Sequence, residues 1–154
     1  MAHALVPGSY ISLETALAYH GWNPEAVHVT ASIVPGPKSS EFEDGLFGRF
    51  SFHPLATQQG HFLELVSRVV IAQQALLVAQ PIRALLDLVC LRKQEWQGIE
   101  WLEHGLRIEQ ELLRSVTAAQ LQTLLMVYKQ KRMQDFIAKL AQALCINVGH
   151  GAEA

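Results

Sequence analysis

The chain has 154 residues, of which 50% are hydrophobic and 17% are charged, so it has the size and apolar content of one folded domain. This composition excludes an intrinsically disordered chain, which would combine low hydrophobicity with high charge. The net charge of −2 provides no overall basic field to hold nucleic acid, although a local basic patch is compatible with it.

Two further features bear on the cellular compartment. The segment from Met1 to Gly8 does not join a basic stretch to a long apolar run, so we expect no signal peptide. Cys90 and Cys145 each lie in an apolar, helix-like run, which predicts two buried free thiols in a reducing compartment; a disulfide between them is the alternative. We therefore expect a cytoplasmic protein.

The amino-acid usage changes near the middle of the chain. Residues before Val78 are rich in Phe, Val, Ser, Thr and Gly, whereas residues after Pro81 are rich in Leu, Gln, Glu, Lys and Ala. This change predicts an α+β fold, in which a small strand-rich N-terminal half with one short helix packs against a helical C-terminal half. We expect a single domain over residues 1–149, with residues 150–154 frayed.

The first expected elements are a turn and a short helix. Pro7-Gly8 predicts the turn, and Ser12 is a suitable N-cap for a helix that ends at Gly21, with Pro24 just beyond. The apolar face of this helix would be formed by Leu13, Ala16, Leu17 and His20.

Strands are expected next. Apolar and polar residues alternate from Val27 to Val34, which predicts a half-buried strand. Residues 42–53 contain Asp44-Gly45 and predict a hairpin with Phe50 and Phe52 on one face. The runs 68–71 and 76–78 fit short strands, but the residues between them fit a helix equally well.

The C-terminal half is expected to contain several helices. Pro81 is well placed as the first residue of a helix whose apolar positions are Ile82, Leu85, Leu86 and Val89. Residues 94–104 predict a second helix, with Trp96 and Ile99 on its apolar side and Gly105 at its end. Thr117 and Gln120 form a capping box that begins a helix with Leu121, Leu124, Leu125 and Tyr128 on one face. A last helix would bury Met133, Phe136, Ile137, Leu140 and Leu144.

Signals for catalysis or metal binding are weak throughout. The histidines lack the spacing of paired metal ligands, no Cys-x-x-Cys occurs, and no phosphate loop or nucleophile elbow is present. We therefore predict no catalytic, metal-binding or cofactor-binding residues. The alternative is a degraded nuclease-like site that uses Glu41, Glu43 and Asp87.

One basic cluster stands out near the junction of the last two helices. It comprises Lys129, Lys131 and Arg132, with Lys139 farther along. A solvated helix face is the structural interpretation of these residues. An anionic partner surface is the functional interpretation, and it fits nucleic acid and an acidic protein equally well.

Four segments resemble the C-terminal domain of AbiEi-type antitoxins of bacterial type IV toxin–antitoxin systems. The most specific is Ser9 to Gly21 (Ser-Tyr-Ile-Ser-Leu-Glu-Thr-Ala-Leu-Ala-Tyr-His-Gly), followed by Pro24-Glu25. The others, in the same order as in the family, are residues 29–32, residues 42–43 with 48–52, and residues 79–88. The resemblance is clear over residues 5–92 and loose over the helical tail.

The resemblance implies a non-enzymatic antitoxin domain that acts in phage defence and counteracts a nucleotidyltransferase-like toxin encoded beside it, without requiring a stable complex. Where the family often has Pro-Glu-Lys-Ala-Leu-Leu-Asp, this chain has Ile82 and Arg83 after Pro81. We therefore list Arg83 with Lys129, Lys131 and Arg132 as candidate partner-binding residues. Family members usually carry an N-terminal winged helix that binds promoter DNA, and we expect this chain to lack it. A nucleic-acid-binding transcriptional regulator of the same operon is the alternative function.

Overall fold

The computed structural model describes residues 8–24, 28–46 and 48–146, and over these residues it confirms the α+β fold. The chain forms two compact units, and each of them is built from two separate segments. Unit 1 comprises Met1–Leu55 and Leu65–Arg92, and unit 2 comprises Ala56–Glu64 and Lys93–Ala154. That the two units behave as a single domain stays a prediction.

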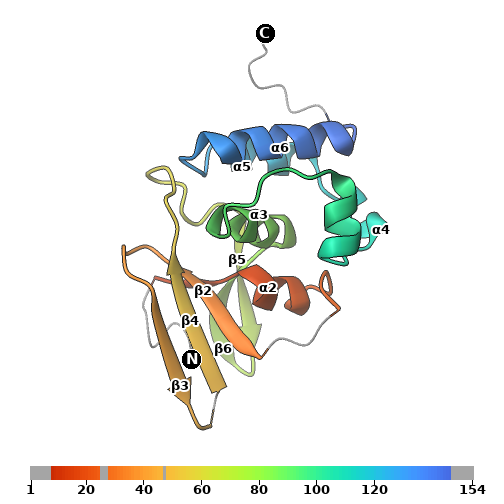
Figure 1. Cartoon of the computed structure of the whole chain (residues 1–154). Coiled ribbons are helices and arrows are strands. Elements are labelled where there is room, and N and C mark those ends of the chain that lie inside the picture. Colours follow the sequence, from red (N-terminus) through yellow and green to blue (C-terminus); the bar gives the residue numbers. More distant parts are fainter. Residues whose placement is uncertain (1–7, 25–27, 47, 147–154) are drawn as a thin grey trace. The chain divides into compact units, whose positions relative to one another are not determined.

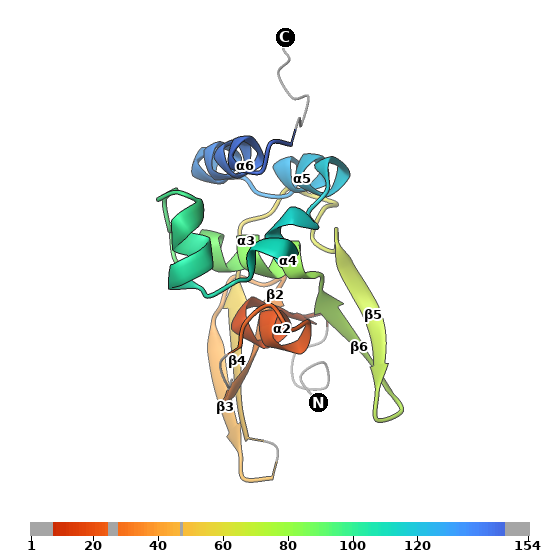
Figure 2. The same cartoon turned by 90° about the vertical axis from the view of Figure 1, so that its right-hand side faces the viewer.

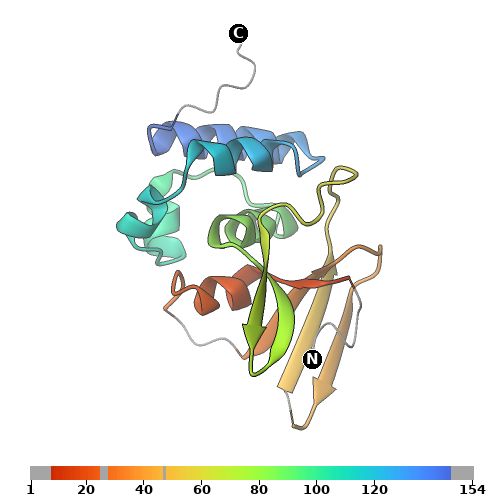
Figure 3. The same ribbon diagram turned by 180° about the vertical axis from the view of Figure 1, so that it is seen from behind.

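Unit 1 contains a six-stranded mixed sheet with the strand order β3-β4-β2-β1-β6-β5 (Figures 1 and 3). The strands β2 and β4 are parallel, as are β1 and β6, and the other neighbours are antiparallel. The bounds are β1 (Tyr10–Ile11), β2 (Val29–Val34), β3 (Ser40–Asp44), β4 (Gly48–Pro54), β5 (Val66–Ile71) and β6 (Gln74–Ala79).

Two hairpins form the outer parts of this sheet, and Figure 2 shows them as two arms on either side of α2. The β3–β4 hairpin confirms the prediction made from Asp44-Gly45. Residues 68–78, for which the sequence fitted strands and a helix equally well, lie in the β5–β6 hairpin, whose two strands are joined through Ala72 and Gln73. Both of these turn residues have positive φ, at 51° and 68°, as a type I′ turn requires.

The expectation that β2 is buried on one face only is wrong. Ala31, Ser32, Ile33 and Val34 are all at most 8% exposed. The helix α2 (Leu13–Tyr19) contacts this strand, and Val34 also belongs to an apolar cluster with Phe50 and Phe52. Successive side chains of a strand point to opposite faces of the sheet. Because both faces of β2 are covered here, the alternate residues that were expected to be exposed are buried as well.

The two helices of unit 1, α2 and α3 (Pro81–Leu91), pack against each other. Ser12 occupies the N-cap position of α2 as predicted, but its side chain makes no capping hydrogen bond. Gly21 follows the helix with a φ of 79°, and Pro81 is the first residue of α3. Every residue from Ile82 to Cys90 is buried, so α3 is covered all round and not only along the predicted stripe.

Unit 2 contains one π-helical turn, η1 (Trp101–Gly105), and the helices α4 (Gln110–Arg114), α5 (Ala118–Leu125) and α6 (Lys131–Ala143). The prediction of a helix over residues 94–104 is wrong at its beginning, because residues 94–98 are irregular and helical structure starts at Ile99. Gly98 has a φ of 95°, which no helix accommodates. The helix α4 was not predicted.

The capping box of α5 is confirmed in both halves. The Gln120 backbone N–H donates to Thr117 Oγ1 at 3.2 Å, and the Thr117 backbone N–H donates to Gln120 Oε1 at 2.9 Å. The helices α5 and α6 lie side by side (Figure 2) and bury Leu121, Leu124, Met133, Phe136, Ile137 and Leu140. The segment 56–64 is held to their junction, since Gln58 N–H donates to the Val127 carbonyl at 2.7 Å.

The two cysteines differ in exposure. Both are free thiols, but only Cys90 is buried, so the prediction of a second buried thiol at Cys145 is wrong. Cys145 follows the end of α6, with a φ of 60°. The predictions for Pro7, for Val27 and for the C-terminal residues 147–154 lie outside the described residues. Among the residues that are described, no helix has both the length and the apolar character needed to cross a bilayer.

Candidate functional site

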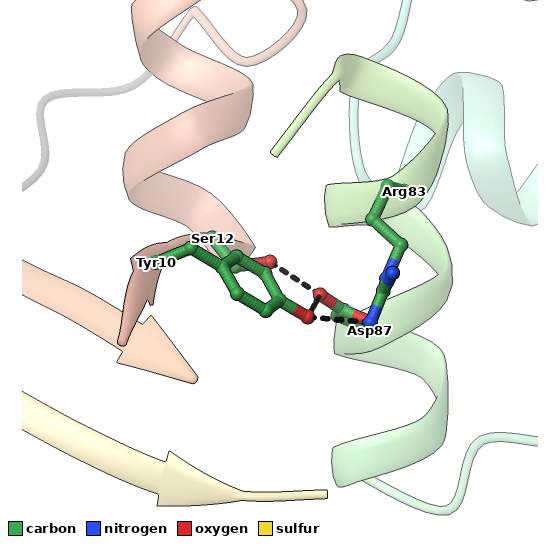
Figure 4. A network of polar contacts seen from close by, with 4 residues as sticks. All are labelled: Tyr10, Ser12, Arg83 and Asp87. Carbon is green, nitrogen blue, oxygen red and sulfur yellow. Dashed lines mark hydrogen bonds and ion pairs between the residues drawn. The ribbon is translucent and has the colours of Figure 1, made fainter. Parts of the chain in front are cut away.

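A buried polar network lies within unit 1, and Figure 4 shows its four residues. The Tyr10 hydroxyl and the Ser12 hydroxyl both donate to Asp87 Oδ2, at 2.6 and 2.8 Å. Arg83 Nε donates to Asp87 Oδ1 at 2.9 Å, and Arg83 Nη2 donates to the Tyr10 hydroxyl oxygen at 2.7 Å. All four side chains belong to residues with 0% exposure.

The geometry of this network follows from local structure. Arg83 and Asp87 are four residues apart on α3, a spacing that brings two side chains onto the same helix face. Tyr10 lies on β1 and Ser12 directly after it, and the Arg83 guanidinium carbon lies 5.1 Å from the Tyr10 ring centroid. Burial, and next the Asp87 charge, raise the pKa of Tyr10 well above its usual value, so its hydroxyl stays protonated and donating.

Arg83, predicted as a partner-binding residue, is therefore not on the surface. Its guanidinium is 0% exposed and bonded to Asp87 and Tyr10. A buried arginine is tolerated where a carboxylate neutralises it and its donors find acceptors, and Asp87 meets the first condition here. The signal that could have revealed this was in the sequence, because Arg83 and Asp87 are an i, i+4 pair inside an otherwise apolar helix.

The other predicted cations lie in unit 2 and separate into two groups. Lys131 and Arg132, together with Lys139, line a pocket with a volume of about 350 Å³. Lys129 is exposed and does not line this pocket. The remaining lining residues are Glu95, Trp96, Asp135 and Phe136. The sequence did not predict this pocket, because a helix was expected to begin at Gln94, whereas residues 94–98 are irregular.

The three carboxylates of the alternative nuclease-like site have separate surroundings. Glu41 and Glu43 lie on β3, opposite Ser51 and Arg49 of β4, and Glu43 pairs with Arg49 at 3.8 Å on the exposed surface. Asp87 is buried on α3, where both of its oxygens accept hydrogen bonds. Over residues 8–24, 28–46 and 48–146, no three His, Cys, Asp or Glu side chains gather as a metal site would require.

Three histidines lie within hydrogen-bond distance of one other residue each. His20 Nε2 lies 2.9 Å from the Ala79 carbonyl, His53 Nε2 lies 3.1 Å from Ser51 Oγ, and His61 Nδ1 lies 3.2 Å from Glu64 Oε2. Burial lowers the pKa of His53, an effect that nearby Glu41 and Glu14 partly oppose. Each of these contacts joins a histidine to one neighbour, as in a structural role.

No model of a known protein family matches the chain, and no curated protein is significantly similar to it.

Proposed function

We propose that this chain is the antitoxin part of a type IV toxin–antitoxin system, which counteracts a nucleotidyltransferase-like toxin in the cytoplasm without catalysis of its own. The observation that supports the proposal is the buried network of unit 1. Tyr10 and Ser12 belong to the segment that most resembles AbiEi-type antitoxins, and Arg83 and Asp87 belong to the last of the four segments. Two of the four segments that carry the resemblance thus bond to each other.

This arrangement favours an interaction module over an enzyme. A catalytic acid or base must reach a substrate within hydrogen-bond distance. Asp87, which belongs to the last of these segments, instead accepts hydrogen bonds on both oxygens from Tyr10, Ser12 and Arg83 and is 0% exposed. Residues with these contacts hold the elements of unit 1 together and are not within reach of a substrate.

The candidate partner contacts are the cations of unit 2. Lys129 and Lys131 are exposed, and Arg132 is partly exposed. Exposed charges of one sign speed the encounter with a partner of opposite charge more than they strengthen the complex. We therefore expect each single substitution here to weaken antitoxin action only modestly.

Co-expression tests the proposal directly. The full chain is expressed in cells together with the nucleotidyltransferase-like toxin encoded next to it, and growth is measured. We expect the chain to restore growth, and a variant that combines Lys129→Glu, Lys131→Glu and Arg132→Glu to restore it less well. If the cells die while the wild-type chain is soluble, folded and abundant, the proposal is wrong for this protein.

A nucleic-acid-binding regulator is the second candidate, and the position of Lys131, Arg132 and Lys139 around one pocket supports it. Binding through phosphate contacts would release counterions and would therefore weaken steeply as salt rises. A gel-shift assay with the DNA upstream of the operon, run at low and then at higher salt, measures this. A chain that shifts no DNA even at low salt is not such a regulator.

A further inference from the structure

The pocket of unit 2 is formed by two segments, the irregular residues 94–98 and the helix α6. Lys131, Asp135 and Lys139 occur at intervals of four along α6, which places them in one row on the helix surface. Glu95 and Trp96 supply the other side. The volume of about 350 Å³ lies near the lower end of the range for small-molecule sites, which is about 300–1,000 Å³.

The walls of this pocket are held in place by specific contacts. Arg132 Nη1 donates to the Gln94 carbonyl at 3.2 Å, which ties the start of α6 to the irregular segment. The Trp96 ring meets the Phe136 ring edge to face, with centroids 5.2 Å apart and planes at 80°. Phe136 is buried in the core of unit 2, so Trp96 is anchored while it stays partly exposed. A pocket with such walls is formed before any ligand arrives.

The charges around the pocket are available to a ligand. Lys131, Lys139, Glu95 and Asp135 are exposed, and none of them takes part in an ion pair within the described part of the chain. Three cationic side chains against two acidic ones leave the lining with an excess of positive charge. The lining therefore combines a group that attracts an anion, a flat apolar ring, and two hydrogen-bond acceptors.

We propose that this pocket binds a nucleoside phosphate. The base packs against Trp96, because aromatic side chains stack on any nucleobase. The phosphate lies at the Lys139 end of the row, where the Lys139 ammonium group donates a charge-assisted hydrogen bond to it, because a phosphate midway between Lys131 and Lys139 would meet the Asp135 carboxylate. The carboxylates of Glu95 and Asp135 accept hydrogen bonds from ribose hydroxyls or amino groups of the base. Inorganic phosphate fits less well, since it has no flat ring to stack on the indole of Trp96 and cannot span the lining from the lysines to Glu95.

This proposal does not depend on the antitoxin function, and the growth assay above does not test it. The experiment is a titration of the full chain at low salt with AMP, GMP, CMP and UMP in turn, followed by tryptophan fluorescence and calorimetry. We expect saturable binding of at least one of them, with a fluorescence change that the Trp96→Phe variant loses. Trp96→Phe retains an aromatic ring beside Phe136, so we expect this variant to fold, and its circular dichroism spectrum checks that it does.

A matched pair of lysine variants assigns the binding to this pocket. Lys139 lines the pocket and Lys129 does not, although both are exposed. We expect Lys139→Ala to weaken binding of the nucleotide about tenfold, as the loss of one charge-assisted contact would, and Lys129→Ala to leave it unchanged. Equal behaviour of the two variants would overturn the proposal, and so would the absence of any calorimetric binding at millimolar nucleotide.

The same calorimetric titration shows whether the ligand is a free nucleotide or the end of a nucleic-acid strand. A free nucleotide is the occupant if AMP binds at least as tightly as a short single-stranded oligonucleotide, and the end of a strand is the occupant if a terminally phosphorylated oligonucleotide binds better. Adenosine and inorganic phosphate serve as partial ligands, and each is expected to bind more weakly than AMP. If inorganic phosphate binds as tightly as AMP, the base makes no contact and the proposal is wrong.

Discussion

Replacing Asp87 by Asn removes the charge at the centre of the buried network while it keeps the size of the side chain. Breaking one partner of a buried ion pair costs about 3–5 kcal/mol, because the other charge stays buried without compensation. Here the remaining charge is the Arg83 guanidinium, which is 0% exposed and lies 2.9 Å from Asp87 Oδ1. We expect the free energy of unfolding to fall by about this amount, which is a large share of the stability of a single domain.

Variants that remove the Tyr10 or the Ser12 hydroxyl group measure how much each hydrogen bond to Asp87 contributes to the free energy of unfolding. Tyr10→Phe removes the donor to Asp87 and an acceptor of Arg83, so it should cost about 1–3 kcal/mol. Ser12→Ala removes one donor only and should cost less, about 1 kcal/mol. The expected order of destabilisation is therefore Asp87→Asn, then Tyr10→Phe, then Ser12→Ala.

Urea denaturation is the appropriate measurement, with Asp135→Asn as the control for an exposed carboxylate of α6. The control should change the stability by less than about 0.5 kcal/mol. The double variant Arg83→Met with Asp87→Leu should cost less than the two single changes together, because it leaves no unpaired charge in the core. If Asp87→Asn lowers the free energy of unfolding by less than about 1 kcal/mol with an unchanged denaturant slope, Asp87 is not needed to compensate the buried charge of Arg83.

Three further predictions concern separate elements. Thr117→Ala removes the acceptor of the capping box and should lower the stability by about 1 kcal/mol in urea denaturation, whereas a loss near zero would mean that α5 does not need its cap. Ala72→Asn combined with Gln73→Gly suits the two positive φ angles of the β5–β6 turn and should raise the melting temperature, so a lower value would contradict the type I′ geometry. The lowered pKa of His53 means that the unfolded chain binds its proton more readily, so the contribution of this residue to stability is complete above about pH 6.5 and is lost as the pH falls further. The variant His53→Gln should flatten this dependence between pH 7 and 5, and an unchanged slope would assign it to other groups.

The elements that could be predicted are those whose signals lie within a few residues. Pro81 at the start of α3, Gly21 after α2 and the Thr117 capping box depend on backbone geometry and on hydrogen bonds to near neighbours. The β3–β4 hairpin likewise depends on its own turn residues. In the β5–β6 hairpin the turn residues are Ala72 and Gln73, neither of which favours positive φ, so the local signal was absent and both strands stayed ambiguous.

The features of the candidate sites likewise include some that the sequence predicts and others that depend on contacts between distant residues. Composition and helical periodicity were enough to predict the α+β class, the apolar faces of α5 and α6, and a basic cluster that begins just before α6. The burial of Arg83, the covering of β2 on both faces and the position of Trp96 beside α6 at a pocket could not be predicted. Burial depends on which side chains arrive from distant parts of the chain, and Asp87 meets Tyr10 across 77 residues of sequence.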